Sequence, residues 1–125
     1  MSSALQQLIL DVGNLDHSIR FYAELLGLEL RNESKVEGVR VASLKAGAAA
    51  LLLVHRPEMS SFDRSGGLVL NFDVVDLRET LKNLATNSVV VLRGLEVSPR
   101  GEASVLVADP DGYAVLLSET QKTVH

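Results

Sequence analysis

The amino-acid sequence contains one pattern twice, with the copies about 62 residues apart. Residues 8–12 read LILDV and residues 70–74 read LNFDV, and each run precedes a stretch with helical spacing; later, residues 50–54 match residues 114–118. A half-sized module cannot close a good core alone, so two such modules must pack together and leave a shared concave surface. We therefore expect residues 1–125 to form one domain whose functional site lies on that surface.

Each half of the chain predicts the order strand, helix and three further strands. In the first half we expect strands at 5–12, 28–34, 38–45 and 49–55, and a helix that Asn14 or Asp16 caps and that ends at about Leu26, before Gly27. In the second half we expect strands at 68–74, near 88–93, at 102–108 and at 113–119, and a helix that begins after Asp76, with Leu77, Leu81 and Leu84 on one face. The modules cover about 4–56 and 68–120, and the polar stretch 57–67 predicts a linker.

Two turns have clear chemistry. Residues 45–48 read KAGA, which predicts a hairpin turn, and residues 109–112 read DPDG. In the second turn Pro110 presets φ, an aspartate can accept a hydrogen bond from a backbone N–H ahead of it, and Gly112 takes a positive φ.

Composition excludes several classes of function. Hydrophobic residues make up 46% of the chain, which is enough for a core without disulfides, and the absence of cysteine removes thiol nucleophiles and thiolate metal sites. The net charge is −4 and the basic residues are scattered, so we expect no nucleic-acid partner. The longest apolar stretch, 46–54, is too short to span a bilayer, so we expect no membrane partner, with the cytoplasm as the default location.

The motifs together resemble a known superfamily. They are VGNL at 12–15, SIRFY at 18–22, Leu26-Gly27, and the DPDG turn at 109–112, and nearly the whole chain takes part. The chain is similar to the glyoxalase, bleomycin-resistance and extradiol-dioxygenase superfamily, or vicinal oxygen chelate fold. The resemblance implies an α+β fold in which two βαβββ modules pair into an eight-stranded, cup-shaped mixed sheet with helices outside. It also implies a homodimer, with the modules paired within one chain or by exchange between chains.

Enzymes of this superfamily typically hold one divalent metal in the cup, with His, Glu or Gln near the first strand of each module and Glu near the last. The matching positions in this sequence are Gln7, Val69, Leu52 and Leu116. Only Gln7 offers an oxygen donor, and one neutral amide cannot hold a metal alone. A register shift that brings His55 and Glu119 into the site is disfavoured, because a shift of three residues turns a strand side chain to the opposite face. We therefore predict no metal cofactor, with a divalent metal at Gln7 as the alternative.

The side chains expected in the cup are mostly apolar with a few polar groups, which is typical of a small-molecule site. Period two along the strands predicts a ligand-binding set of Gln7, Ile9, Asp11, Leu52, Val54, Val69, Asn71, Asp73, Leu116 and Ser118, with Ala114 beside them. Arg100 lies on a loop that often borders the cup in this superfamily, where it either clamps a ligand anion or is solvated. The face occupied by Arg40 is left open, and Phe21 and Tyr22 are expected in the core.

Asp11 and Asp73 are the candidate catalytic residues. If the two carboxylates lie close together, their repulsion could raise one pKa and create a general base; otherwise each caps its own turn. Three functions therefore remain open. The first is a metal-independent protein that binds an antibiotic or another small organic ligand. The second is a lyase, isomerase or dioxygenase-like enzyme with an atypical metal set or an Asp base, and the third is a scaffold whose strand edges bind protein partners.

Overall fold

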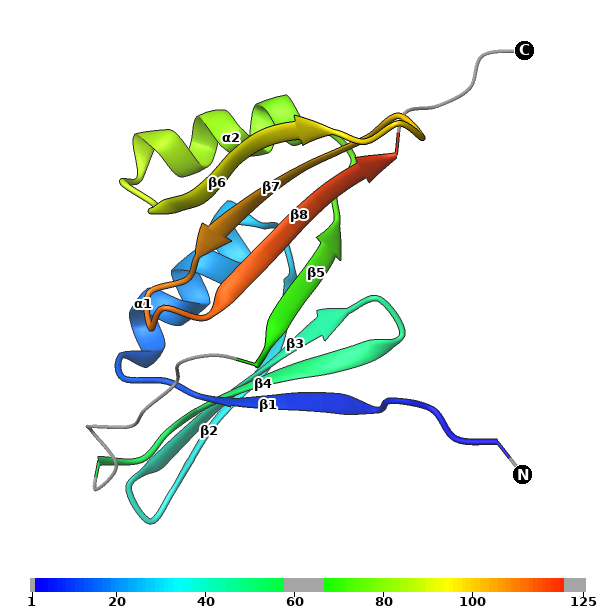
Figure 1. Ribbon diagram of the computed structural model, residues 1–125. Coiled ribbons are helices and arrows are strands. Elements are labelled where there is room, and N and C mark those ends of the chain that lie inside the picture. Colours follow the sequence, from blue (N-terminus) through cyan, green and yellow to red (C-terminus); the bar gives the residue numbers. More distant parts are fainter. Residues whose placement is uncertain (1, 58–66, 121–125) are drawn as a thin grey trace. The chain divides into compact units, whose positions relative to one another are not determined.

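The computed structural model describes residues 2–57 and 67–120, and the chain divides into two compact units, residues 1–63 and 64–125 (Figure 1). Most of the predicted linker, residues 58–66, lies outside the described residues. Unit 1 contains β1 (Gln7–Asp11), α1 (Leu15–Ile19), the π-helical segment η1 (Arg20–Leu25), β2 (Glu29–Val36), β3 (Val39–Ala46) and β4 (Ala49–His55). Unit 2 contains β5 (Val69–Asp73), α2 (Leu77–Thr86), β6 (Val91–Val97), β7 (Glu102–Ala108) and β8 (Ala114–Thr120).

The eight strands form two four-stranded sheets with the same topology. The order is β1-β4-β3-β2 in unit 1 and β5-β8-β7-β6 in unit 2, and in each sheet the first two strands are parallel while the others are antiparallel. The predicted α+β class and the two βαβββ modules are confirmed. The arrangement of the modules as a cup stays a prediction.

Strand register confirms the internal repeat residue by residue. In unit 1 Gln7 pairs with Ala50 and Ile9 with Leu52. In unit 2 Val69 pairs with Ala114 and Asn71 with Leu116. Residues that the sequence comparison placed in equivalent positions therefore have equivalent neighbours.

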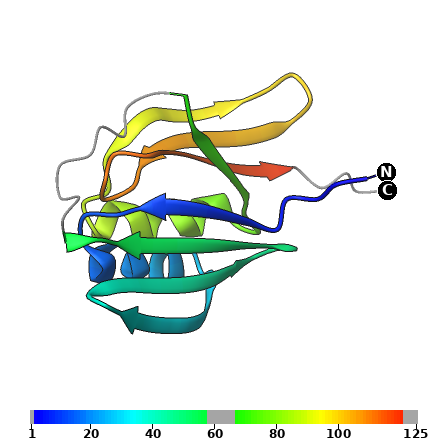
Figure 2. The same cartoon turned by 90° about the horizontal axis from the view of Figure 1, so that it is seen from below.

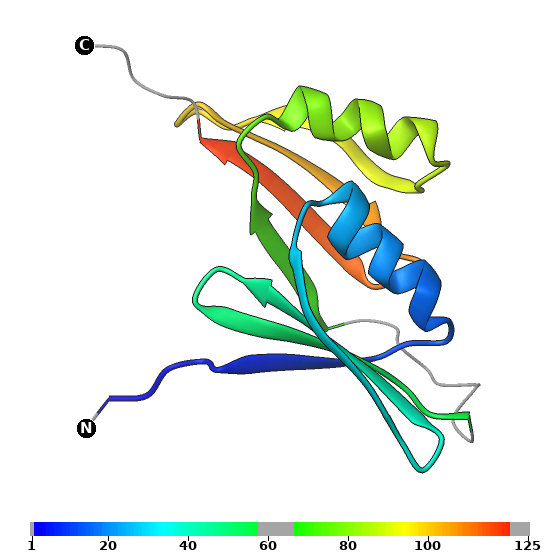
Figure 3. The same cartoon turned by 180° about the vertical axis from the view of Figure 1, so that it is seen from behind.

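Alternation along the strands places the core of each unit between its sheet and its helix. In β4, Leu51 and Leu53 are buried on the face that carries α1, which contacts β3 and β4. Figure 2 shows α1 behind the strands of its own sheet, and Figure 3 shows α2 along the strands of unit 2. The largest fully buried side chains are Tyr22, Leu10, Leu44, Leu51, Leu53, Leu77, Leu84 and Leu117. No helix in the described part of the chain is long and apolar enough to cross a membrane.

The first helix begins and ends where the sequence predicts but changes its winding. The side chain of Asn14 accepts a hydrogen bond from the backbone N–H of His17, and Gly27 takes a φ of +82° after the last turn. From Arg20 the helix is π-helical, and the N–H of Leu26 donates to the carbonyl of Phe21 at 3.0 Å. Within this segment the adjacent Phe21 and Tyr22 are both buried, and their rings meet edge to face at 4.9 Å. Both residues lie in the core, as predicted.

The predicted strand near 88–93 is wrong in its bounds, because β6 runs from Val91 to Val97. Residues 88 and 89, which precede β6, belong instead to the turn that ends α2. Ser88 has a φ of +58°, and the N–H of Val89 donates to the carbonyl of Leu84. Asp76 caps the start of α2 as predicted, since its side chain accepts from the N–H of Glu79.

The DPDG turn has the predicted chemistry. Oδ1 of Asp109 accepts hydrogen bonds from the N–H groups of Asp111 and Tyr113, both at 2.9 Å, and Gly112 has a φ of +89°. The turn at 45–48 is also a hairpin turn, since Lys45 pairs with Ala50, Ala46 pairs with Ala49 and Gly47 has a φ of +63°.

Candidate functional site

In each unit one face of the sheet carries the helix, and we call the other the open face. In unit 1 Gln7, Ile9 and Asp11 of β1 lie on the open face, in register with Ala50, Leu52 and Val54 of β4. In unit 2 Val69, Asn71 and Asp73 of β5 lie on the open face, in register with Ala114, Leu116 and Ser118 of β8. Each predicted strand residue of the ligand-binding set therefore lies on the open face of its own unit.

The open face of unit 1 is mostly apolar near its centre. Ile9 is 51% exposed, Leu52 is half-buried and Val54 is buried, and Val41 of β3 pairs with Val54. Asp11 lies at the end of this face, where its Oδ1 is 3.7 Å from a terminal nitrogen of Arg56. An ion pair therefore holds the first of the two candidate catalytic carboxylates.

The open face of unit 2 carries a row of polar side chains from β6 to β5. A terminal nitrogen of Arg93 donates to Oγ of Ser104 at 2.9 Å, and Ser104 is the register partner of Ser118 on β8. Oγ of Ser118 then donates to Oδ1 of Asn71 on β5 at 3.1 Å. Asp73, the second candidate catalytic residue, is exposed and is the register partner of Ser118. Ser118 itself is only 5% exposed, so its hydrogen bond holds the centre of the row in place.

Three residues whose orientation matters for the site face the helices instead. Nδ1 of His55 lies 3.0 Å from the carbonyl of Val12, and a carboxylate oxygen of Glu119 accepts from the N–H of Leu77 at the start of α2. Arg40 pairs with Asp16 of α1 at 3.1 Å, which places its side chain on the helix side of the sheet. His55 and Glu119 thus point away from the open faces, as the parity argument predicts, and the open question about Arg40 is answered.

Arg100 lies in the turn between β6 and β7 and is exposed. The N–H of Gly101 donates to the carbonyl of Ser98, and the N–H of Ser98 donates to the carbonyl of Glu102. These bonds close the hairpin beyond the last residues of the two strands. The role of Arg100 as an anion clamp stays a prediction.

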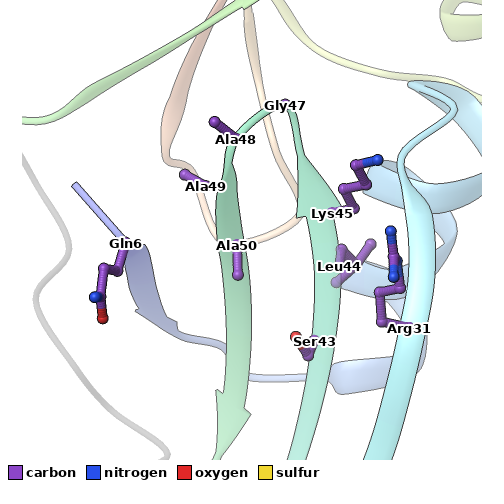
Figure 4. A pocket seen from close by; sticks show the side chains of 9 residues that line it. All are labelled: Gln6, Arg31, Ser43, Leu44, Lys45, Gly47, Ala48, Ala49 and Ala50. Carbon is purple, nitrogen blue, oxygen red and sulfur yellow. The ribbon is translucent and has the colours of Figure 1, made fainter. Parts of the chain in front are cut away.

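A shallow pocket of about 260 Å³ opens at the β3–β4 hairpin of unit 1 (Figure 4). It is lined by Gln6, Arg31, Ser43, Leu44, Lys45 and residues 47–50. Residues 47–50 have no side chain larger than a methyl group, which leaves the space open. Two cationic side chains, from the neighbouring strands β2 and β3, border it.

Comparison with known proteins gives the family. The model of the "Glyoxalase/Bleomycin resistance protein/Dioxygenase superfamily" matches residues 4–117. The chain belongs to this superfamily. The matched residues cover nearly all of the two units described above, so the repeated βαβββ order is the superfamily's fold.

Solved structures agree with this assignment. Lactoylglutathione lyase from Agrobacterium tumefaciens is 26% identical, with a TM-score of 0.69, and 94% of each chain is covered. The trypanothione-dependent glyoxalase I of Leishmania major is 24% identical with a TM-score of 0.80, covering 95% of this chain and 88% of that one. TioX from Micromonospora sp. ML1 is 17% identical with a TM-score of 0.73, covering 95% of this chain and 100% of that one. The last two likenesses concern the fold alone.

The donor atoms at the superfamily's metal positions do not fit a metal ion. Gln7 offers one amide oxygen, whereas its repeat equivalent Val69 and the β4 and β8 residues Leu52 and Leu116 offer none. Across residues 2–57 and 67–120 there is also no group of three or more His, Cys, Asp or Glu side chains that could hold a metal ion.

Sequence reasoning missed Arg93 and Ser104 in unit 2 and Arg31, Ser43 and Lys45 in unit 1. Ser104 could have been found, because β7 was placed correctly and the repeat sets its register against β8. Arg93 and Arg31 lie beside irregularities in strand pairing, between Val91 and Arg93 and between Leu30 and Asn32. A bulge changes which face a side chain occupies, so simple alternation could not place them.

Proposed function

We propose that this protein binds a small, largely apolar organic ligand on its open faces without a metal. The resemblance to the bleomycin-resistance branch extends the proposal to sequestration of an antibiotic or a compound of similar character. The ligand-binding set is the one predicted from the sequence, joined by Ser104 and Arg93. Its apolar members supply contact area and its polar row orients the ligand.

The observation that carries the proposal is the position of Leu52 and Leu116. Both lie on open faces in equivalent register, at the positions where the metal enzymes of the superfamily have carboxylates. Each leucine replaces a charged donor with an apolar contact, and the same replacement has occurred in both modules. Ile9 and Val69 are 51% and 56% exposed on the same faces, which adds apolar surface that a ligand could cover.

Metal content tests the first half of the proposal. We expect elemental analysis of the purified protein, after dialysis against buffer without chelator, to find far less than one divalent ion per chain. One ion per chain that survives dialysis and is lost in Gln7→Ala would refute metal independence.

Ligand capture tests the second half. Native mass spectrometry of the purified protein, followed by release and small-molecule mass spectrometry, should detect an organic compound bound in a fixed ratio. Leu116→Asn should reduce the bound fraction, because it places an amide on the apolar part of the open face. The matched control is Val75→Asn, since Val75 is 91% exposed in the loop before α2. Equal retention by both variants, with unchanged circular dichroism, would refute this location of the site.

A homodimer in the cytoplasm is part of the same proposal. Light scattering at micromolar concentration should give the mass of two chains, and a monomer would refute the dimer. Cell fractionation should recover the protein with the cytoplasmic fraction, and recovery elsewhere would refute that location.

A further inference from the structure

We propose that the pocket at the β3–β4 hairpin of unit 1 is a subsite for a small carboxylate group. This inference rests on the proposed function, because it assigns an acidic group to the ligand that the open face binds. It names a chemical class of ligand, an organic acid with an apolar body.

The charges around the pocket favour an anion. Lys45 and Arg31 both line it, and no described residue forms an ion pair or a hydrogen bond with the side chain of Lys45. Nε of Arg31 pairs with a carboxylate oxygen of Glu29. Within the described ranges the terminal guanidinium nitrogens of Arg31 have no such partner, so they can donate to a second carboxylate. Ser43 adds a hydroxyl group that can donate as well.

The shape of the pocket also favours a small, flat anion. Residues 47–50 form one wall and present only glycine and alanine (Figure 4). The N–H of Ala50 donates to the carbonyl of Gln6 at 2.9 Å, which ties the segment before β1 to this wall. The bulge at Arg31 explains why an arginine from the edge strand reaches the pocket, because an extra residue re-aims the side chain.

Register connects the pocket with the rest of the open face. Lys45 pairs with Ala50, and two residues further along the same strands Ser43 pairs with Leu52. Leu52 therefore lies about 7 Å along the strand from Ala50, the partner of Lys45. A carboxylate bound at Lys45 would place an attached apolar body over Ala50 and Leu52. In unit 2 the residue equivalent to Lys45 is Ala108, which pairs with Ala114, so the second module lacks this cation.

The test is an NMR titration of ¹⁵N-labelled protein with sodium propionate at constant ionic strength, with sodium chloride as the blank. We expect saturable shifts in the backbone amides of residues 43–50. Lys45→Gln should weaken propionate binding about threefold to fivefold, as expected for one exposed charge contact. The matched control is Lys35→Gln, which removes the same charge from the neighbouring strand β2. Lys35 is the register partner of Arg40, whose side chain faces α1, so this charge is lost on the side of the sheet away from the pocket.

Two further variants separate charge from shape. Glu29→Gln should tighten propionate binding about twofold, because it releases Arg31 from its present partner. Ala50→Leu should abolish the shifts without changing any charge, because the larger side chain fills the pocket.

Equal weakening by Lys45→Gln and Lys35→Gln, or equal shifts with chloride, would overturn the inference. Tighter binding of inorganic phosphate than of propionate at the same site would overturn the assignment to a carboxylate. If a ligand co-purifies but propionate produces no local shifts, the subsite fails and the proposed function stands. If propionate binds but no ligand is ever captured, the proposed function fails and the anion site stands.

Discussion

The DPDG turn supports a quantitative prediction, because one side-chain oxygen accepts two of the hydrogen bonds that hold the connection between β7 and β8. Oδ1 of Asp109 accepts from two backbone N–H groups, those of Asp111 and Tyr113, and Asp109 is only 5% exposed. Asp109→Ala removes the acceptor and leaves both N–H groups without it. The hydrogen bond to Tyr113 lies in a buried environment, so water cannot fully replace the lost oxygen.

The expected cost follows from these two bonds. A hydrogen bond to a charged acceptor contributes about 1.5 to 3 kcal/mol, and a buried N–H left without a partner costs about 1 to 3 kcal/mol. Since the N–H of Asp111 is nearer to solvent and can bind water, we expect Asp109→Ala to lower the free energy of unfolding by about 2 to 4 kcal/mol. The matched variant is Asp109→Asn, which keeps an oxygen acceptor and loses only the charge. It should cost about 1 kcal/mol.

Urea denaturation followed by far-UV circular dichroism measures both variants against the parent protein. The midpoint should fall clearly in Asp109→Ala and slightly in Asp109→Asn, with similar slopes. A loss below about 0.5 kcal/mol in Asp109→Ala, or the same loss in both variants, would show that the acceptor oxygen does not hold the turn.

Three further perturbations can be measured in the same assay. Gly112→Ala should lower the free energy of unfolding by about 1 to 2 kcal/mol, because φ at Gly112 is +89°. Gly94→Ala, in open space and without a positive φ, should change it by no more than about 0.5 kcal/mol. Equal losses in the two variants would contradict the conformational argument. Asp76→Ala should cost about 1 kcal/mol, since it removes the N-cap of α2, and an unchanged midpoint would show that the cap is dispensable. Leu53→Ala should lower the free energy of unfolding by about 2 to 5 kcal/mol, because Leu53 is fully buried on the helix side of the sheet. Leu52→Ala, on the open face, should lower it markedly less. The reverse order would show that the two faces are misassigned.

Features that depend on a few neighbouring residues could be predicted from the sequence. Asn14 and Asp76 cap their helices because a short polar side chain directly before an apolar helical stripe can accept a free N–H of the first turn. Gly27 and Gly112 take positive φ values at the turns where glycine is expected, because glycine has no Cβ to oppose that conformation. The orientation of His55 and Glu119 followed from strand parity once the strands were placed.

Features that depend on packing or on irregular pairing could not be predicted. The π-helical winding of residues 20–25 leaves no mark in the apolar spacing, which fits an ordinary α-helix equally well. The apolar run from Val89 predicts an early start for β6, but the N–H of Val89 bonds the end of α2, so the strand begins at Val91. Arg31 reaches the pocket through a bulge, and a bulge breaks the alternation from which faces are read.

The duplicated register separates positions that the core constrains from positions that it leaves free. At the centre of the helix sides, equivalent positions stay apolar: Leu10 corresponds to Phe72, Leu51 to Val115 and Leu53 to Leu117. At the strand ends polar residues occur on this side, and His55 corresponds to Glu119. On the open faces, Leu52 and Leu116 match, as do Asp11 and Asp73, but other equivalent positions exchange character. Gln7 corresponds to Val69, Ile9 to Asn71, Val54 to Ser118, Val41 to Ser104 and Lys45 to Ala108. The centre of each helix side is constrained by the volume of the core, so only apolar exchanges fit there. The open faces are free of that constraint, and the two modules have used the freedom differently, one with a cationic pocket beside an apolar surface and the other with a polar row. A ligand on the open face of unit 1 would meet an exposed cation, Lys45, beside an apolar surface, which favours a molecule with an acidic end and an apolar body.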